Sequence, residues 1–205
     1  MKYPLLSFEG PLQIRISLIE QNKNLYIPLE LNLIMISKIR ENIWQFKFKK
    51  FGSYIYLIKI NKKNILIDTG SPENINSLLE DLSELKLTPQ EIHLVILTHN
   101  HWDHLGGLVL FLNSKVYGSK KDFGENLLDP KKLKIKGLNI IETPGHSKGG
   151  ICILYKDVLF SGDTIFHRNT IGRTDLPGSS KKEMQESLKK ISKLKFKTLC
   201  PGHGY

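Results

Sequence analysis

A cluster of histidines directly after a short apolar run is the feature that restricts the possible folds most. Residues 92–98 read IHLVILT, which has the length of a strand and is almost continuously apolar, so we expect a strand buried on both faces. Three histidines and one aspartate follow within six positions: His99, His101, Asp103 and His104. Burying unpaired polar groups costs free energy, so these side chains need partners or an ion. The chain must therefore contain a sheet whose strand end opens onto a polar site.

Short strand-like runs alternate with amphipathic helices along most of the chain. One helix is expected to begin at Ser71 and Pro72, another to run from a capping box at Ser180 to Leu194, and a shorter one to cover 104–112. The expected strands lie at 43–48, 53–60, 64–70, 92–98, 115–118, 138–143, 150–156, 158–163 and from 198 on. This order predicts a single α/β domain, with two sheets and helices outside them.

The N-terminal part has a pattern of its own. Apolar and polar residues alternate in 12–18 and again in 25–35, with turn residues between, which predicts a β-hairpin. Pro28 restricts its second strand to an edge or a bulge. We therefore divide the single domain into a hairpin extension at 1–35 and a core at 36–205. The hairpin is expected to extend the edge of the first sheet, with a dimerisation element as the alternative.

Three further predicted strands end in metal-binding residue types. His146 and His203 each follow a strand in a Pro-Gly turn, and Asp163 directly follows a third strand. Strand ends that meet at one edge of a sheet are common places for sites. Imidazole and carboxylate are good ligands for zinc or iron. We therefore expect one metal site with seven ligands: His99, His101, Asp103, His104, His146, Asp163 and His203.

The composition narrows the choice of partners. The chain of 205 residues has 30 Lys and Arg against 20 Asp and Glu, a net charge of +10. Because the lysines are spread over the whole chain, we interpret the charge as compositional bias and do not expect a nucleic-acid partner. No run reaches the roughly 18 apolar residues that span a bilayer, and residues 1–12 lack an uninterrupted apolar segment, so we expect a cytoplasmic protein without a membrane partner. Cys152 and Cys200 are expected to be buried free thiols.

The order of these motifs resembles the metallo-β-lactamase fold superfamily, which implies a four-layered αβ/βα sandwich with a dinuclear metal site on its edge. Residues 162–178 resemble the glyoxalase II-like hydroxyacylglutathione hydrolases and also the persulfide dioxygenases. Asp163 stands where the zinc β-lactamases of the antibiotic-resistance class carry cysteine, so hydrolysis of penicillins is not expected. The matching motifs are ILIDTG at 65–70, HNHWDH at 99–104, TPGH at 143–146, SGDT at 161–164 and PGHG at 201–204.

The resemblance also implies roles for the ligands. Asp163 and a hydroxide would bridge two metal ions, and Asp103 would be the catalytic residue that orients this hydroxide as the nucleophile. The implied cofactors are two divalent ions per chain, zinc in the first place, with iron or manganese as alternatives. Asp68, at another strand end, either orients a ligand histidine or is a turn residue. One ion would be held by His99, His101 and His146, and the other by Asp103, His104 and His203.

By the same resemblance, the expected activity is hydrolysis of small thioesters such as S-2-hydroxyacylglutathione. His167, Arg168 and Arg173 follow on a loop after the predicted ligand at 163 and are candidates for contact with an anionic substrate. The alternative for all three is a loop-bracing role, which for Arg173 would be an ion pair with Asp175. Three other functions stay open: a mononuclear-iron persulfide dioxygenase, an RNA-processing nuclease and a non-catalytic binding module. The sequence does not indicate the oligomeric state.

Overall fold

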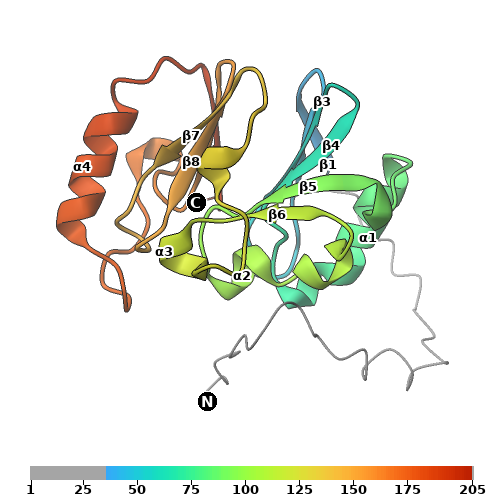
Figure 1. Ribbon diagram of the computed structural model, residues 1–205, viewed down its shortest axis with the longest axis horizontal. Coiled ribbons are helices and arrows are strands. Elements are labelled where there is room, and N and C mark those ends of the chain that lie inside the picture. Colours follow the sequence, from blue (N-terminus) through green and yellow to red (C-terminus); the bar gives the residue numbers. More distant parts are fainter. Residues whose placement is uncertain (1–35, 205) are drawn as a thin grey trace. The chain divides into compact units, whose positions relative to one another are not determined.

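The structure is a computed structural model, and it describes residues 36–204 (Figure 1). The hairpin expected at 12–35 lies outside the described residues, so it stays a prediction. Within the described range the strands form two sheets. The first contains, in spatial order, β1 (Ile36–Arg40), β2 (Ile43–Phe46), β3 (Ile55–Ile60), β4 (Lys63–Ile67), β5 (Ile92–Ile96) and β6 (Lys115–Tyr117). The second contains β10 (Thr198–Pro201), β9 (Val158–Gly162), β8 (Ile151–Tyr155) and β7 (Leu138–Glu142).

The direction of the strands brings the polar motifs to one edge. β5 pairs in parallel with both β4 and β6, and β10 pairs in parallel with β9. The other neighbouring strands pair antiparallel. Because parallel strands end on the same side of a sheet, the residues that follow β4 and β5, and those that follow β9 and β10, lie close together. The sheet topology therefore determines where a site can form.

The helices are short. The α-helices are α1 (Ile75–Glu84), α2 (Trp102–Leu105), α3 (Lys120–Phe123) and α4 (Lys181–Ile191), and the 3₁₀ turns are η1 (Pro72–Asn74), η2 (Pro89–Glu91), η3 (Leu108–Phe111), η4 (Pro130–Lys132) and η5 (His167–Asn169). Ser180 caps α4 as expected, because its Oγ accepts a hydrogen bond from the Glu183 amide at 3.2 Å. Ser71 does not cap with its side chain, since its Oγ donates to the Phe51 carbonyl at 2.8 Å. No helix in residues 36–204 is long and apolar enough to cross a membrane.

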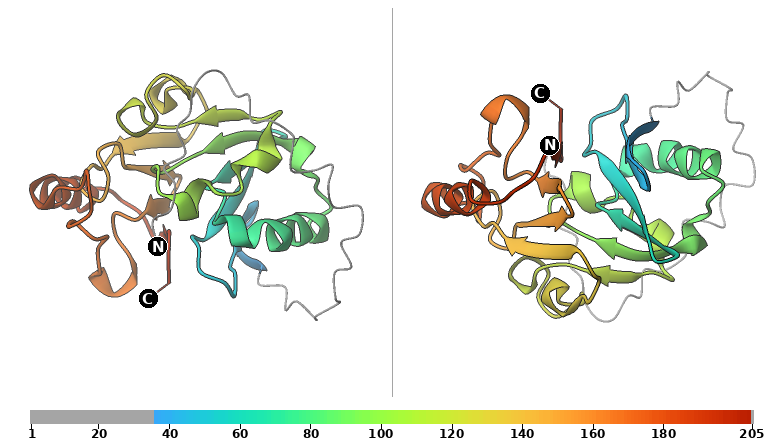
Figure 2. Two further views of the ribbon diagram at one scale, coloured as in Figure 1. Left: turned by 90° about the horizontal axis from the view of Figure 1, so that it is seen from below. Right: turned by 90° about the horizontal axis from the view of Figure 1, so that it is seen from above.

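Buried apolar side chains form three clusters, one between the two sheets and one between each sheet and the helices outside it. This arrangement confirms the four-layered sandwich. In β3, Tyr56 and Ile58 face the second sheet, whereas Ile55 and Leu57 face the helices on the other side. A buried side chain of this size contributes roughly 1.5–3 kcal/mol to stability, so a strand buried on both faces anchors two layers. α1 covers the first sheet and α4 covers the second, on opposite outer faces (Figure 2). Both cysteines are buried and free, as expected.

Three expected helices were wrong in part. The one expected to begin at Ser71 and Pro72 starts as the 3₁₀ turn η1, and α1 itself begins at Ile75. The helix predicted at 104–112 is divided into α2 and η3, and the reason is the close packing of its two glycines. The Gly106 amide donates to the Gly70 carbonyl at 2.8 Å, and a Cβ on Gly106 would overlap Pro72. The backbone there bonds to a neighbouring segment instead of continuing a helix. α4 also ends earlier than expected, at Ile191 and not at Leu194.

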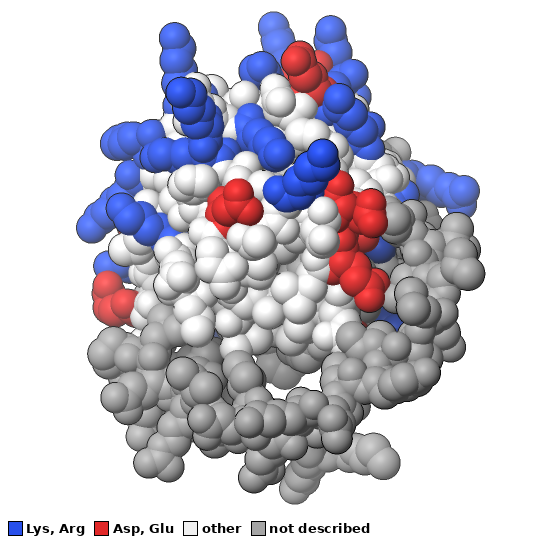
Figure 3. Space-filling view, turned by 90° about the vertical axis from the view of Figure 1, so that its right-hand side faces the viewer, with Lys and Arg blue, Asp and Glu red and all other residues white. Residues whose placement is uncertain are grey.

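Charged side chains lie on the outer surface. Lysines and arginines gather on the upper part of the face shown in Figure 3, with acidic side chains below and among them. Some form ion pairs, such as Lys120 with Glu125 at 2.7 Å and Lys131 with Glu142 at 2.9 Å. Exposed pairs of this kind are screened by solvent and salt and add little to stability. The high net charge is therefore a property of the solvated surface and adds little to the stability of the fold.

Candidate metal centre

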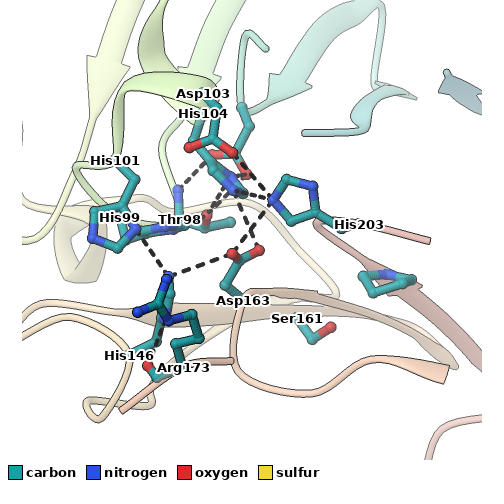
Figure 4. Close-up of polar contacts among 12 residues, drawn as sticks. Thr98, His99, His101, Asp103, His104, His146, Ser161, Asp163, Arg173 and His203 are labelled. Carbon is teal, nitrogen blue, oxygen red and sulfur yellow. Dashed lines mark hydrogen bonds and ion pairs between the residues drawn. The ribbon is translucent and has the colours of Figure 1, made fainter. Parts of the chain in front are cut away.

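Seven histidine and aspartate side chains converge where strands of both sheets end (Figure 4). They come from the end of β5, from α2, from the turn between β7 and β8, and from the ends of β9 and β10. Five of them are buried and two are partly exposed. The seven are the residues that the sequence pattern predicted as ligands: His99, His101, Asp103, His104, His146, Asp163 and His203.

The first group contains three histidines. His99, His101 and His146 each offer one ring nitrogen within 4.8 Å of the others. The His146 Nε2 and His101 Nδ1 atoms are 2.9 Å apart. His99 and His101 lie on the extended segment after β5, which lets alternate side chains point the same way, and His146 reaches them from the second sheet.

The second group contains one carboxylate and two histidines. Asp103, His104 and His203 also place their ligand atoms within 4.8 Å of one another. The His104 Nε2 and His203 Nε2 atoms are 3.3 Å apart, and His203 Nε2 lies 3.2 Å from Asp103 Oδ2. Asp103 and His104 are carried by α2, so the two groups share one continuous segment of chain but occupy different parts of it.

Asp163 lies between the two groups. Its Oδ1 is 3.3 Å from His104 Nε2, and its Oδ2 is 3.4 Å from both His146 Nε2 and His203 Nε2. It therefore contacts histidines of both groups. The strand that carries His203 approaches Asp163 closely at Gly202, where a Cβ would overlap the Asp163 carboxylate. Glycine at this position allows the carboxylate to reach both groups.

The donor atoms fit divalent cations. His99 Nε2 is buried without a hydrogen-bond partner, and Asp163 Oδ1 accepts no hydrogen bond, although His104 Nε2 lies 3.3 Å from it. Leaving a buried polar atom such as His99 Nε2 unpaired costs about 1–3 kcal/mol, and a bound cation would remove that cost. Imidazole nitrogen and carboxylate oxygen suit zinc and iron, and seven donors exceed the usual four of a single tetrahedral ion. There are therefore enough donors for two ions, and His99, His104 and Asp163, whose donor atoms also lie within 4.8 Å of one another, connect the two groups.

Neighbouring groups fix the orientation of the histidine rings. His104 Nδ1 lies 2.8 Å from Asp68 Oδ2, which turns Nε2 toward the second group. Asp68 is itself held by the Thr98 amide and hydroxyl, both of which donate to it at 2.8 Å. His146 Nδ1 donates to the Arg173 carbonyl at 2.8 Å, which turns its Nε2 toward the first group. Partners of this kind set the tautomer and increase the basicity of a ligand histidine.

Burial and the two carboxylates divide the histidines into different charge states. Burial lowers the pKa of His99 well below its usual value and that of His101 to about 4, so both rings are neutral at pH 7. Burial also favours neutral His203, but its contacts with Asp103 and Asp163 outweigh this and raise its pKa to about 9. The pKa of Asp163 is held well below its usual value, because the imidazole charges around it outweigh the effect of burial. In the metal-free protein the ionised Asp163 carboxylate therefore lies beside protonated His203, whereas His99 and His101 of the first group are neutral.

The three residues proposed for substrate contact follow Asp163 in the chain. His167 and Arg168 are exposed on η5, after β9. Arg173 forms the ion pair that was the alternative reading, since its Nε and Nη2 atoms donate to Asp175 at 2.9 and 2.8 Å. Its backbone carbonyl also accepts from a ligand histidine, a contact that sequence patterns do not reveal.

An exposed aromatic pair lies beside the second group. Trp102, whose surface is 52% exposed, contacts the 64% exposed Phe51 with ring centres 5.8 Å apart. The Phe51 ring stacks on His203 at a ring distance of 5.8 Å. Trp102 lies within the histidine motif at 99–104, whereas Phe51 belongs to no recognisable motif. The pair forms an apolar wall next to the centre.

This sandwich, with histidine and aspartate donors of two sheets gathered at one edge, defines a class of αβ/βα metalloproteins. The family model described as "Metallo-beta-lactamase superfamily" matches residues 49–121 and 115–203. The chain belongs to the metallo-β-lactamase superfamily and is a metallo-hydrolase of that superfamily.

Curated relatives agree with this assignment. A probable metallo-hydrolase of Methanocaldococcus jannaschii is 42% identical over 143 residues, which cover 68% of this chain and 70% of the relative. Hydroxyacylglutathione hydrolase 1 of Vibrio vulnificus is 35% identical over 156 residues, covering 71% of this chain but 59% of the relative. The chain thus spans little more than half of that longer protein.

Solved structures share the fold. The protein TTHA1623, crystallised in a di-iron-bound form, superposes with a TM-score of 0.65 and 26% identity, covering 78% of this chain and 92% of the other. ETHE1 from Myxococcus xanthus gives a TM-score of 0.64 at 26% identity, covering 78% and 75%.

Proposed function

We propose that residues 36–205 form a catalytic core that binds two divalent cations and hydrolyses small thioesters. The position of Asp163 between two groups of donors carries this proposal, because one carboxylate in contact with both groups suits a bridging ligand. The hydroxyacylglutathione hydrolases among the relatives support the thioester class. In this assignment, one ion is held by His99, His101 and His146, and the other by Asp103, His104 and His203, with Asp163 shared.

The chain's own residues then have separate tasks. Bound cations would supply a water of lowered pKa and would polarise the scissile carbonyl. Asp103 is the proposed catalytic residue, since its pKa is lowered: burial acts against this, but the hydrogen bond from His203 outweighs it. Asp103 therefore remains a carboxylate at neutral pH and can orient the attacking water by accepting a hydrogen bond from it. Asp68 keeps His104 in the tautomer that presents Nε2.

The surroundings suggest how a substrate is oriented. Phe51 and Trp102 provide an apolar wall on the side of His203, where an uncharged part of the substrate would pack. His167 and Arg168 are exposed on η5 and would contact an anionic part. We give Arg173 mainly a positioning task, because its guanidinium is paired with Asp175.

We expect the Asp68→Ala variant to bind zinc about 10–100-fold more weakly than the wild type, because His104 would lose the group that orients it. Competition with a chromophoric chelator measures this affinity. Asp129→Ala is the matched control, since Asp129 caps η4 by accepting from the Lys131 amide at 2.9 Å and contacts no ligand. Equal zinc affinity in the two variants would mean that Asp68 is only a turn residue.

The proposed function is tested by elemental analysis of protein purified without added metal and without oxygen, followed by assays with a panel of thioesters. Two ions per chain together with metal-dependent thioester hydrolysis are expected. One iron per chain, no hydrolysis, and oxygen uptake with a persulfide would overturn the proposal in favour of the mononuclear-iron dioxygenase. A chain that takes up no metal on reconstitution would overturn both.

A further inference from the structure

Asp122 on α3 contacts the loop that carries His146. Its Oδ2 accepts a hydrogen bond from the Ser147 hydroxyl at 2.7 Å, and its Oδ1 accepts one from the Gly149 amide at 2.6 Å. Ser147 directly follows His146 in the chain. One carboxylate thus holds both a side chain and a backbone group just after this ligand. Hydrogen bonds to a charged acceptor are about twice as strong as neutral ones.

The same residue contacts the other loop of the first group. Asn100 lies between His99 and His101, and its Nδ2 donates to the Asp122 carbonyl at 3.2 Å. Asp122 therefore connects the segment after β5 with the turn between β7 and β8, although these belong to different sheets.

The packing leaves little freedom for this arrangement. A Cβ on Gly149 would lie 2.7 Å from Asp122 Cγ and 2.8 Å from the Asp122 nitrogen, so the loop passes directly over the carboxylate. Asp122 is held in turn by its amide, which donates to the Ser119 carbonyl at 3.0 Å. Ser119 follows β6, which pairs in parallel with β5. The position of Asp122 is thus tied to the sheet that carries His99.

We propose that Asp122 is a positioning residue that fixes the distance between His146 and the His99–His101 pair, and so sets the affinity of the first of the two metal positions. This inference rests on the proposed function, because it assumes that the first group binds an ion. The second group has separate support, since His104 is oriented by Asp68 and not by α3. Loss of the Asp122 side chain is therefore expected to lower the affinity for one of the two ions selectively.

The first test is a cobalt(II) titration, followed by visible absorption, of the metal-free full chain. Asp122→Ala is expected to lower the affinity for one ion about 10–100-fold and to leave the other within about threefold of the wild type. Asp122→Asn should recover the wild-type affinity for the most part, because its amide oxygen still accepts from Gly149 and its NH₂ can donate to the Ser147 hydroxyl. Asp129→Ala is again the control, as an aspartate that caps a short turn elsewhere.

A double-mutant cycle identifies which ion is weakened. If Asp122 acts on the first position, Asp122→Ala does not lower the cobalt affinity further in a protein that already carries His101→Ala. In a protein that carries His203→Ala, it lowers the cobalt affinity by its full amount. Gly149→Ala, which displaces the carboxylate by steric overlap, should reproduce the selective loss.

The outcomes separate this inference from the proposed function. A wild type that binds two ions, with an Asp122→Ala variant of equal affinity for both, overturns the role of Asp122 alone. An equal loss of affinity at both metal positions also overturns it, because Asp122 would then affect the whole centre and not the first position. A wild type that binds no cobalt contradicts the proposed function itself. If Asp122→Ala does not fold, Ser147→Ala and Asn100→Ala each remove one contact, and unchanged affinity in both overturns the inference.

Discussion

The Asp163→Asn variant is expected to lose thioester hydrolysis by roughly a thousandfold or more, since removal of a shared ligand costs several kcal/mol and each 1.4 kcal/mol is a factor of ten in rate. Asparagine has the shape of aspartate but lacks its negative charge. Asp163 is the carboxylate that contacts His104, His146 and His203 together, so both metal positions should be affected. Metal content per chain and thioester turnover, measured on the same preparation, check this expectation.

The matched control is Asp175→Asn. Asp175 lies twelve positions further along the same segment, is exposed, and pairs with Arg173 at 2.8 Å, so its loss should change turnover by no more than a few fold. If Asp163→Asn retained two ions and near wild-type turnover, the bridging role of this carboxylate would be wrong. If both variants lost activity equally, the effect would come from the loop and not from the ligand.

Removal of the metal ions is expected to lower the melting temperature by about 8–16 °C. A ligand at a thousand times its Kd contributes about 4 kcal/mol, and 1 kcal/mol corresponds to about 2–4 °C in a domain of this size. The physical reason is that His99 Nε2 is buried without a hydrogen-bond partner when no cation is bound. Calorimetry with and without a chelator measures the shift, and added zinc should restore both melting temperature and activity. An unchanged melting temperature after complete removal would contradict the metal centre.

The zinc affinity should also rise with pH. With its pKa raised to about 9, His203 is protonated at pH 7 in the metal-free protein, and it must lose this proton to bind an ion. Zinc and the proton therefore compete, so the proton released by His203 alone gives roughly tenfold tighter binding per pH unit up to about pH 9. His104 acts in the same direction, because burial lowers its pKa but the contacts with Asp163 and Asp68 outweigh this and raise it. In the metal-free protein, the stabilisation from protonated His203 is present below the ordinary histidine pKa and is lost as the pH rises through about 9.

The convergence of the seven side chains could be predicted because most of them follow apolar strands in the sequence. The run at 92–98 and the Pro-Gly turns before His146 and His203 marked strand ends, and the parallel pairing of β4 with β5 and of β9 with β10 brings those ends together. For Asp68, the sequence left two readings, and the structure places its carboxylate 2.8 Å from His104. Local patterns were sufficient where each residue's position depends on its own strand.

The parts that could not be predicted depend on contacts between distant segments. Phe51 has no motif, and its place beside the centre follows from how the segment between β2 and β3 lies against α2. The division of the 104–112 helix depends on Gly106 meeting Pro72, which periodicity does not reveal. The task of Arg173 lies in its backbone carbonyl, a group that every residue possesses. Side-chain patterns carry no information of this kind.

The two sheets contribute ligands unequally. The first provides four within six positions of one segment, and the second provides His146, Asp163 and His203 from three separate strand ends. In the proposed assignment neither half of the chain holds a complete set, so a bound pair of ions would act as a cross-link between them, comparable to a disulfide that joins distant positions. Such a link closes a long loop in the unfolded chain, and its effect grows with loop length. Complete loading with metal would therefore report, in folding or fragment-complementation experiments, that the two halves have docked.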